Sequence, residues 1–180
     1  MHPNLPMRYW CQDESRLGLK TEWGRVITAP GVKPIQAVQW KRQAFYLYGI
    51  VAPLTGDSLF YEFSHLDGVC FEQFLKLVSA AFPNHLNVLQ LDQASAHTSE
   101  QIDIPENIAL LVQPAHTPEL NPIERVWQDI KADLKGTVFE NLDALREALR
   151  EVLGYFTPDW LASLSGYDYI LSALSVAGIN

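Results

Sequence analysis

The chain has 180 residues, of which 48% are hydrophobic and 19% are charged, and this suits one domain that buries its own core. No apolar run approaches the roughly 20 residues of a membrane span, the first residues lack the order of a signal peptide, and two cysteines are too few for a disulfide scaffold. We therefore expect a soluble, cytoplasmic, single-domain protein over residues 1–180, whose net charge of -8 by itself argues against a nucleic-acid partner.

The first part of the chain predicts three strands. Residues 8–13 form a largely apolar segment that ends in Asp13. Residues 44–52 and 58–63 are rich in aromatic and β-branched side chains, and they are separated by Pro53 and a Thr-Gly-Asp turn. That pattern is typical of a β-hairpin.

Between the first strand and the hairpin lies a basic stretch, residues 14–43. It carries two anions, Glu14 and Glu22, and more cations than anions although the whole chain is acidic. We take these cations as candidate contacts to nucleic-acid phosphates, with an ordinary solvated surface as an equal alternative. They are Arg16, Lys20, Arg25, Lys33, Lys41 and Arg42.

The middle of the chain predicts a helix followed by two strands. Asp67 can cap the helix, apolar residues then recur at helical spacing, and Pro83 ends it. Residues 86–92 form a short apolar strand that again ends in an acid, Asp92, and residues 108–112 form another strand.

Three helical segments follow. One begins near Asn121 and repeats apolar residues along one face, and a second covers residues 141–153 with Gly154 as its terminator. A short third helix opens at Thr157 and Pro158. An antiparallel start followed by a strand–helix–strand crossover predicts an α/β domain, a mixed sheet flanked by helices.

Asp13 and Asp92 end two different strands, and ligands of open α/β sheets bind beyond the carboxyl ends of parallel strands. Two carboxylates that meet there repel each other unless a divalent cation neutralises them. Hard cations such as Mg²⁺ prefer such oxygen ligands. The alternative for each aspartate is an ordinary turn residue, so the pair alone does not define a function.

Glu124 follows Asn121 and Pro122 at a predicted helix start. Spacing alone favours a capping box, in which the glutamate bonds back to the cap residue. Glu124 also lies on the rim of the apolar face, from which it can reach the edge of the sheet. His97, five residues after Asp92, either contacts phosphate or holds the loop backbone.

Three blocks of sequence, in this order along the chain, resemble the DDE transposases, and among these the mariner-related bacterial insertion sequences of the type numbered six hundred and thirty. The blocks are Cys11-Gln-Asp13-Glu-Ser-Arg-Leu-Gly18, Leu91-Asp92-Gln-Ala-Ser-Ala-His97 and Pro118-Glu-Leu-Asn-Pro-Ile-Glu124-Arg-Val-Trp127. The third is the most specific, because Leu-Asn-Pro-Ile-Glu followed by Trp recurs in that family at the third catalytic position.

The resemblance implies a ribonuclease-H-like fold in which Asp13, Asp92 and Glu124 are catalytic and hold two Mg²⁺ or Mn²⁺ ions. It implies cleavage of a transposon end followed by joining of the freed 3′-hydroxyl to target DNA. Two neighbouring metals suit such in-line displacements, since one activates the attacking oxygen and the other stabilises the leaving oxygen.

Full-length relatives carry helix-turn-helix modules ahead of this domain, and only 12 residues precede Asp13 here, so we expect those modules to be absent. An upstream subunit could supply them, and relatives act as dimers, so a homodimer is a further expectation. Two alternatives remain open at this point. One is a catalytically inactive DNA-binding or assembly subunit, and the other is a nuclease of the same fold that does not transpose.

Overall fold

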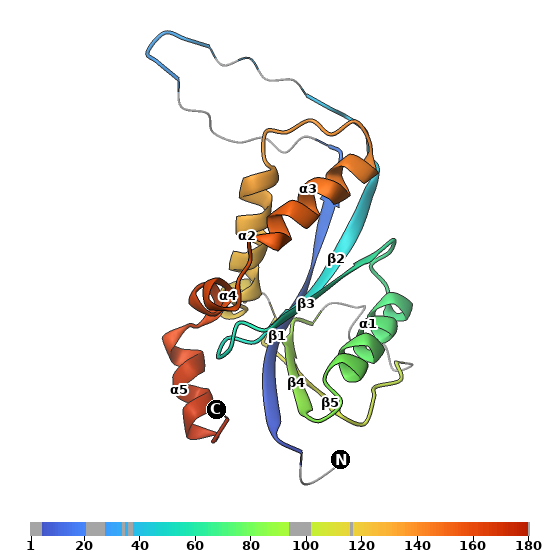
Figure 1. Cartoon of the computed structure of the whole chain (residues 1–180), viewed down its shortest axis with the longest axis vertical. Coiled ribbons are helices and arrows are strands. Elements are labelled where there is room, and N and C mark those ends of the chain that lie inside the picture. Colours follow the sequence, from blue (N-terminus) through green and yellow to red (C-terminus); the bar gives the residue numbers. More distant parts are fainter. Residues whose placement is uncertain are drawn as a thin grey trace.

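The protein was analysed as a computed structural model, which describes residues 5–20, 28–33, 35, 38–93, 102–115 and 117–179. In this part of the chain a five-stranded sheet has the strand order β3-β2-β1-β4-β5. Helix α1 covers one face of the sheet, and α2 to α5 lie over the other (Figure 1). No described helix has both the length and the apolar character needed to cross a bilayer.

The first three strands form an antiparallel meander, as the sequence predicts. They are β1 (Met7–Gly18), β2 (Ala44–Val51) and β3 (Ser58–Phe63). The predicted end of the first strand at Asp13 is wrong, because β1 continues to Gly18 by pairing with β2. Backbone bonds along this ladder hold the polar residues after Asp13 in a strand, which their hydropathy does not indicate.

The crossover is also confirmed. Helix α1 (Gly68–Ala81) is capped by the Asp67 side chain, which accepts from the backbone N–H of Cys70. It leads into β4 (Leu86–Leu91), which pairs in parallel with β1, and β5 (Ile108–Val112) pairs in parallel with β4. The sheet is therefore mixed, with its parallel half at β1, β4 and β5.

The C-terminal part is helical throughout. A 3-10 turn η1 (Pro118–Leu120) precedes α2 (Ile123–Leu134), and α3 (Leu142–Gly154) starts at the predicted cap Asn141, whose side chain accepts from the backbone N–H of Ala144. The predicted short helix is α4 (Pro158–Ser165), capped by Thr157. The last helix, which the sequence left unassigned, is α5 (Asp168–Val176).

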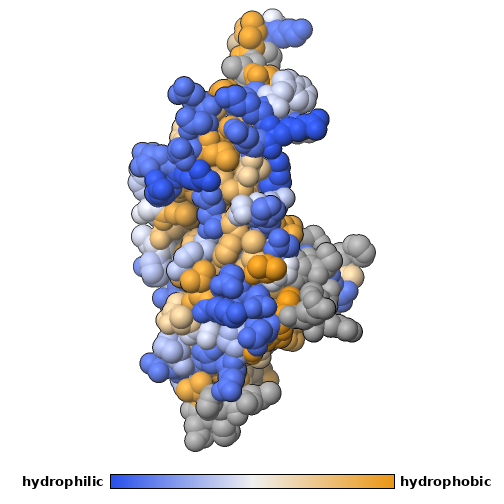
Figure 2. Space-filling view, turned by 90° about the vertical axis from the view of Figure 1, so that its right-hand side faces the viewer, coloured by the Kyte–Doolittle hydropathy of each residue, from blue (hydrophilic) through white to orange (hydrophobic). Residues whose placement is uncertain are grey.

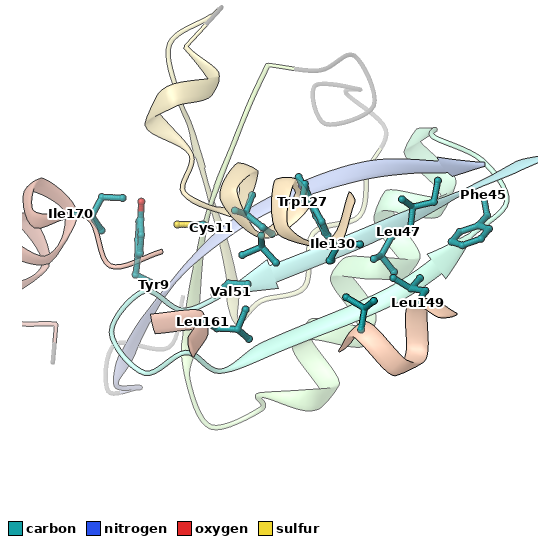
Figure 3. Packing of buried hydrophobic residues seen from close by; sticks show 14 of the residues in the cluster. Tyr9, Cys11, Phe45, Leu47, Val51, Trp127, Ile130, Leu149, Leu161 and Ile170 are labelled. Atoms are coloured by element: carbon teal, nitrogen blue, oxygen red, sulfur yellow. The ribbon is translucent and has the colours of Figure 1, made fainter. Parts of the chain in front are cut away.

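Successive side chains of β1 point to opposite faces of the sheet, so the core has two parts. Tyr9 and Cys11 face the helices α2 to α5, where Trp127 and Ile130 pack on the sheet (Figure 3). Trp10 faces α1 on the other side. Each buried aliphatic or aromatic side chain of α2 contributes roughly 1.5–3 kcal/mol by leaving water. This packing fixes the position of α2 on β1, which decides where the acids of both elements lie.

Candidate active site

The strand register brings Asp13 and Asp92 to the same level of the sheet. The last parallel pair between β1 and β4 is Cys11 with Gln90, and two residues further along each strand stand Asp13 and Asp92. Side chains two residues apart on a strand share a face. Asp13 therefore lies on the face of Cys11, and Asp92, which directly follows β4, lies on the face of Gln90. These are one face, since Tyr9 on β1 bonds Gln90 on β4.

Asp13 is fixed by a hydrogen bond from helix α2. The indole Nε1–H of Trp127 donates to Asp13 Oδ2 over 2.8 Å. The bond joins residues far apart in the chain, and it holds the carboxylate on the side of the sheet that α2 covers. The sequence indicates Trp127 as part of the third block that resembles the family, and this role was missed. The signal available was an indole donor one turn after Glu124.

A glycine makes room for this contact. Gly49 on β2 stands opposite Asp13 in the ladder, and a Cβ there would lie 2.6 Å from Trp127 Cη2 and 2.8 Å from Phe60 Cδ1. The Trp127 and Phe60 rings meet edge to face with centroids 5.9 Å apart. The indole can therefore reach Asp13 only because the residue opposite has no side chain.

Glu124 lies in the first turn of α2, partly buried, and the predicted capping box is not formed. Pro122 is the cap residue of the helix and there is no side-chain cap bond. Asn121, expected to cap the helix, is 2% exposed, and its Nδ2 donates to the backbone carbonyl of Gln12 on β1 over 2.8 Å. Because this bond ties the start of α2 to the strand that carries Asp13, it positions Glu124 relative to that aspartate.

A chain of buried amides braces the same region from β4. Gln90 accepts from the Tyr9 hydroxyl, and its Nε2 donates to Gln113 Oε1 at 3.0 Å and to the Leu120 carbonyl at 2.9 Å. Leu120 ends η1, directly before Asn121. Sequence analysis did not single out these glutamines. The signal that could have found Gln90 was a polar side chain near the end of the apolar strand that leads to Asp92.

Electrostatics couple Asp13 to Glu124. Desolvation, followed by the carboxylates of Glu14 and Glu124, raises the pKa of Asp13 to about 8, and hydrogen bonds from the backbone N–H of Glu14 and from Trp127 oppose the shift. A desolvated carboxylate next to other carboxylates is stabilised in its charged form by a cation, and its oxygens suit a hard divalent ion. The residues present therefore fit Mg²⁺ or Mn²⁺.

The third acid is level with this pair but less closely coupled to it. Asp92 is partly buried and is not among the groups that act on the pKa of Asp13. In the described part of the chain, no group of three or more acidic, histidine or cysteine side chains is close enough to hold a metal ion. The structure thus brings Asp13 and Glu124 together, and it places Asp92 on their face without completing a cluster.

The predicted phosphate contacts divide into two sets. Arg16, Lys20, Lys33, Lys41 and Arg42 are all exposed, beyond the acids along β1 or on the connection to β2. Arg25 and His97 lie outside the described residues, so the structure says nothing of these two predictions.

The chain belongs to a known family of nucleases. A family model described as DDE superfamily endonuclease matches residues 8–146, which is well over half of the chain and includes Asp13, Asp92 and Glu124. A curated relative, the uncharacterized protein y4pE/y4sA of Sinorhizobium fredii, is 31% identical over 100 residues, which cover 54% of this chain and 74% of the relative. The DDE superfamily assignment confirms the family that the three sequence blocks indicated.

Solved structures confirm the ribonuclease-H-like fold. The Mos1 transposase paired-end complex with left transposon end superposes with a TM-score of 0.69 at 14% identity, covering 88% of this chain and 51% of that one. The Mos1 mariner paired-end complex with Mn gives 0.69 at 16% identity, covering 87% and 51%. The chain thus spans about half the length of these transposases.

Proposed function

We propose that this chain is the catalytic domain of a transposase that cleaves DNA and joins the cut end to target DNA, with Asp13, Asp92 and Glu124 as its catalytic acids. One observation carries the proposal. Two strands that are neighbours in the sheet bring aspartates to the same level and face, and helix α2 carries Glu124 near enough to Asp13 to act on its pKa. Membership in an endonuclease family supports this function over that of an inactive assembly subunit.

The three acids act in this proposal as oxygen ligands for two Mg²⁺ or Mn²⁺ ions, whose chemistry is to lower the pKa of an attacking hydroxyl and to neutralise charge on the phosphate. The protein's own part is to hold the carboxylates in place. Trp127 holds the Asp13 carboxylate by donating to Oδ2. Asn121 and Gln90 keep the start of α2 against β1 and β4. No side-chain nucleophile is needed.

DNA ends and target DNA are the proposed substrates. The similar Mos1 transposase was solved in a paired-end complex with a transposon end, and in one with Mn. The similarity extends over almost nine-tenths of this chain. The described cations of the connection between β1 and β2, Lys20, Lys33, Lys41 and Arg42, are exposed and suited to phosphates.

The decisive experiment is Mn²⁺-dependent nicking of supercoiled DNA by the purified chain. We expect Asp92→Ala, Asp13→Asn and Glu124→Gln each to abolish nicking. Glu119→Gln is the matched control, since Glu119 is an exposed acid near the start of the same helix and we expect it to keep full activity. Nicking that persists in a clean preparation of Asp92→Ala refutes the assignment.

Metal binding gives a readout that does not depend on catalysis. Binding to the native state raises the free energy of unfolding by about 2.7 kcal/mol when the metal is at a hundred times its Kd. Millimolar Mn²⁺ should therefore raise the melting temperature of the wild-type chain but not of Asp92→Ala. Pre-cut DNA ends then separate a transposase from a simple nuclease, because only a transposase yields joined products.

A further inference from the structure

A small hollow lies beyond the acids, where β1 and α2 end. It is formed by the last residues of β1, the last turn of α2 and the turn that follows it. Its lining includes four cations, Arg16, Lys20, Lys131 and Lys135, and no acid from the described part of the chain. In a protein with a net charge of -8, four cations around one hollow are a local reversal of sign.

These four cations have no carboxylate partner among the described residues, unlike half of the other described cations. Within the described ranges, four other cations are paired: Arg8 with Asp57, Lys76 with Glu72, Arg146 with Glu62 and Asp143, and Arg150 with Glu147. None of the four around the hollow forms an ion pair with another described residue, and Lys20 lies over the ring of Trp40 at 5.6 Å. Their charge is therefore available to a ligand.

A purely structural explanation covers only part of the cluster. Lysines near a helix C-terminus stabilise the helix dipole, which is reason enough for Lys131 in the last turn of α2 and for Lys135 directly after it. It does not explain why Arg16 and Lys20 come from another element to line the same hollow. An anion that contacts both elements does explain it.

The position of the hollow relative to the acids indicates what kind of anion fits. Along α2, Lys131 and Lys135 follow Glu124 by about 10 and 16 Å at roughly 1.5 Å per residue. Along β1, Arg16 follows Asp13 by about 10 Å at roughly 3.3 Å per residue. Both elements thus run from an acid to the cations, and α2 packs on β1 over this length. The separation corresponds to about three to five base pairs of duplex at 3.4 Å per pair.

We infer that this hollow, which we call the α2-end site, binds the phosphate backbone of the DNA duplex about three to five base pairs from the phosphate at the acids. The inference rests on the proposed function for the distance between the α2-end site and the cut, but DNA binding at this site needs no catalysis. Its contacts carry no sequence information, because they reach phosphates and not base edges. They set how far along the duplex the cut is made.

The test compares two double variants that remove the same charge from different places. Lys131→Gln/Lys135→Gln alters the α2-end site, and Lys76→Gln/Arg150→Gln is the matched control at paired cations. Binding to a labelled duplex of about 25 base pairs is followed by fluorescence anisotropy in EDTA between about 50 and 200 mM salt. We expect the first variant to bind at least roughly tenfold more weakly, with a salt slope lower by about 1–2, and the control to match the wild type.

The distance between the α2-end site and the cut is tested by replacing DNA phosphates with neutral methylphosphonates in the Mn²⁺ nicking assay. Placed about three to five base pairs from the cut, they should slow the wild-type chain and leave Lys131→Gln/Lys135→Gln unaffected. Equal affinity and slope in all three proteins, or equal losses in both double variants, overturn the inference even where nicking is normal. If a wild-type chain binds the duplex through Lys131 and Lys135 and yet fails to nick it, that result supports the α2-end site and rejects the proposed function.

Discussion

The indole N–H of Trp127 donates to Asp13 Oδ2 over 2.8 Å, and this bond connects helix α2 to the strand at the centre of the sheet. It sets the orientation of a carboxylate that is partly buried and close to Glu124. Groups that orient a metal ligand commonly change metal affinity by tenfold to a hundredfold when they are removed. Trp127 is therefore a positioning residue for the proposed site.

Trp127→Phe tests this role, since it keeps an aromatic ring against Phe60 and removes the donor. We expect the Kd for Mn²⁺, measured by titration in the absence of DNA, to rise about tenfold. Trp160→Phe is the control, because the Trp160 Nε1–H also donates to an aspartate, Asp129 at 3.1 Å, but on an exposed surface. Equal Mn²⁺ affinity in both variants and the wild type would contradict the role.

Gly49→Ala tests whether the indole needs the space opposite Asp13. The added methyl group would stand 2.6 Å from Trp127 Cη2 and 2.8 Å from Phe60 Cδ1, so the rings must move. Overpacking of this kind destabilises a core by about 1–3 kcal/mol, which should lower the melting temperature in thermal denaturation and weaken Mn²⁺ binding. Gly154→Ala, where a Cβ meets nothing within 4 Å, should be neutral or slightly stabilising.

Two asparagines that precede helices should respond differently to alanine. Asn141 is a true cap, so Asn141→Ala should lower stability by about 1 kcal/mol in urea denaturation and leave nicking unchanged. Asn121 bonds the Gln12 carbonyl from a buried position, so Asn121→Ala leaves a buried acceptor unpaired, at about 1–3 kcal/mol. It should also reduce the nicking rate, because the start of α2 loosens from β1. Equal behaviour of the two variants would mean that Asn121 is an ordinary cap.

Most of the fold could be predicted from the sequence, because its signals are local. Period-two and helical patterns, together with Asp67, Asn141 and Thr157 as caps, place most strands and helices within a residue or two. The end of β1 was wrong because residues after Asp13 are polar and are held in the strand by the ladder to β2. Pairing between strands is not a local property, so hydropathy does not report it.

At the candidate site, residue types could be predicted and contacts could not. The three acids stand out because they lie in blocks that resemble a family. The cap predicted at Asn121 was wrong because an Asn-x-x-Glu spacing fits both a capping box and a bridge to a neighbouring strand. Which one forms depends on how closely β1 approaches, and only the tertiary structure sets that. The same holds for Trp127, whose apolar ring and polar N–H serve the core and Asp13 at once.

The raised pKa of Asp13 makes a prediction about stability in the metal-free chain. Its pKa is about 8 in the folded state and near 3.8 without the fold, so between these values the native state binds more protons than the unfolded state. Stability should therefore fall as pH rises from about 4 to 8. Asp13→Asn can still accept the hydrogen bond from Trp127 but has no carboxyl group to ionise, so its stability should not fall in this way. We expect its melting temperature at about pH 8.5 to exceed that of the wild type by a few degrees, since 1 kcal/mol corresponds to roughly 2–4 °C in a chain of this size.

Thermal denaturation of both proteins from pH 4.5 to 8.5 in EDTA measures the difference. It should shrink toward pH 4.5, because the pKa of Asp13 without the fold is near 3.8 and Asp13 is protonated in both states only below that value. Asp133→Asn, an exposed acid on the same helix as Glu124, is the control and should follow the wild type at every pH. Added Mn²⁺ should reverse the order at high pH, because it stabilises only the chain that keeps its carboxylate. If the melting temperatures of Asp13→Asn and the wild type differ by the same amount at every pH, the pKa of Asp13 is not raised in the folded state.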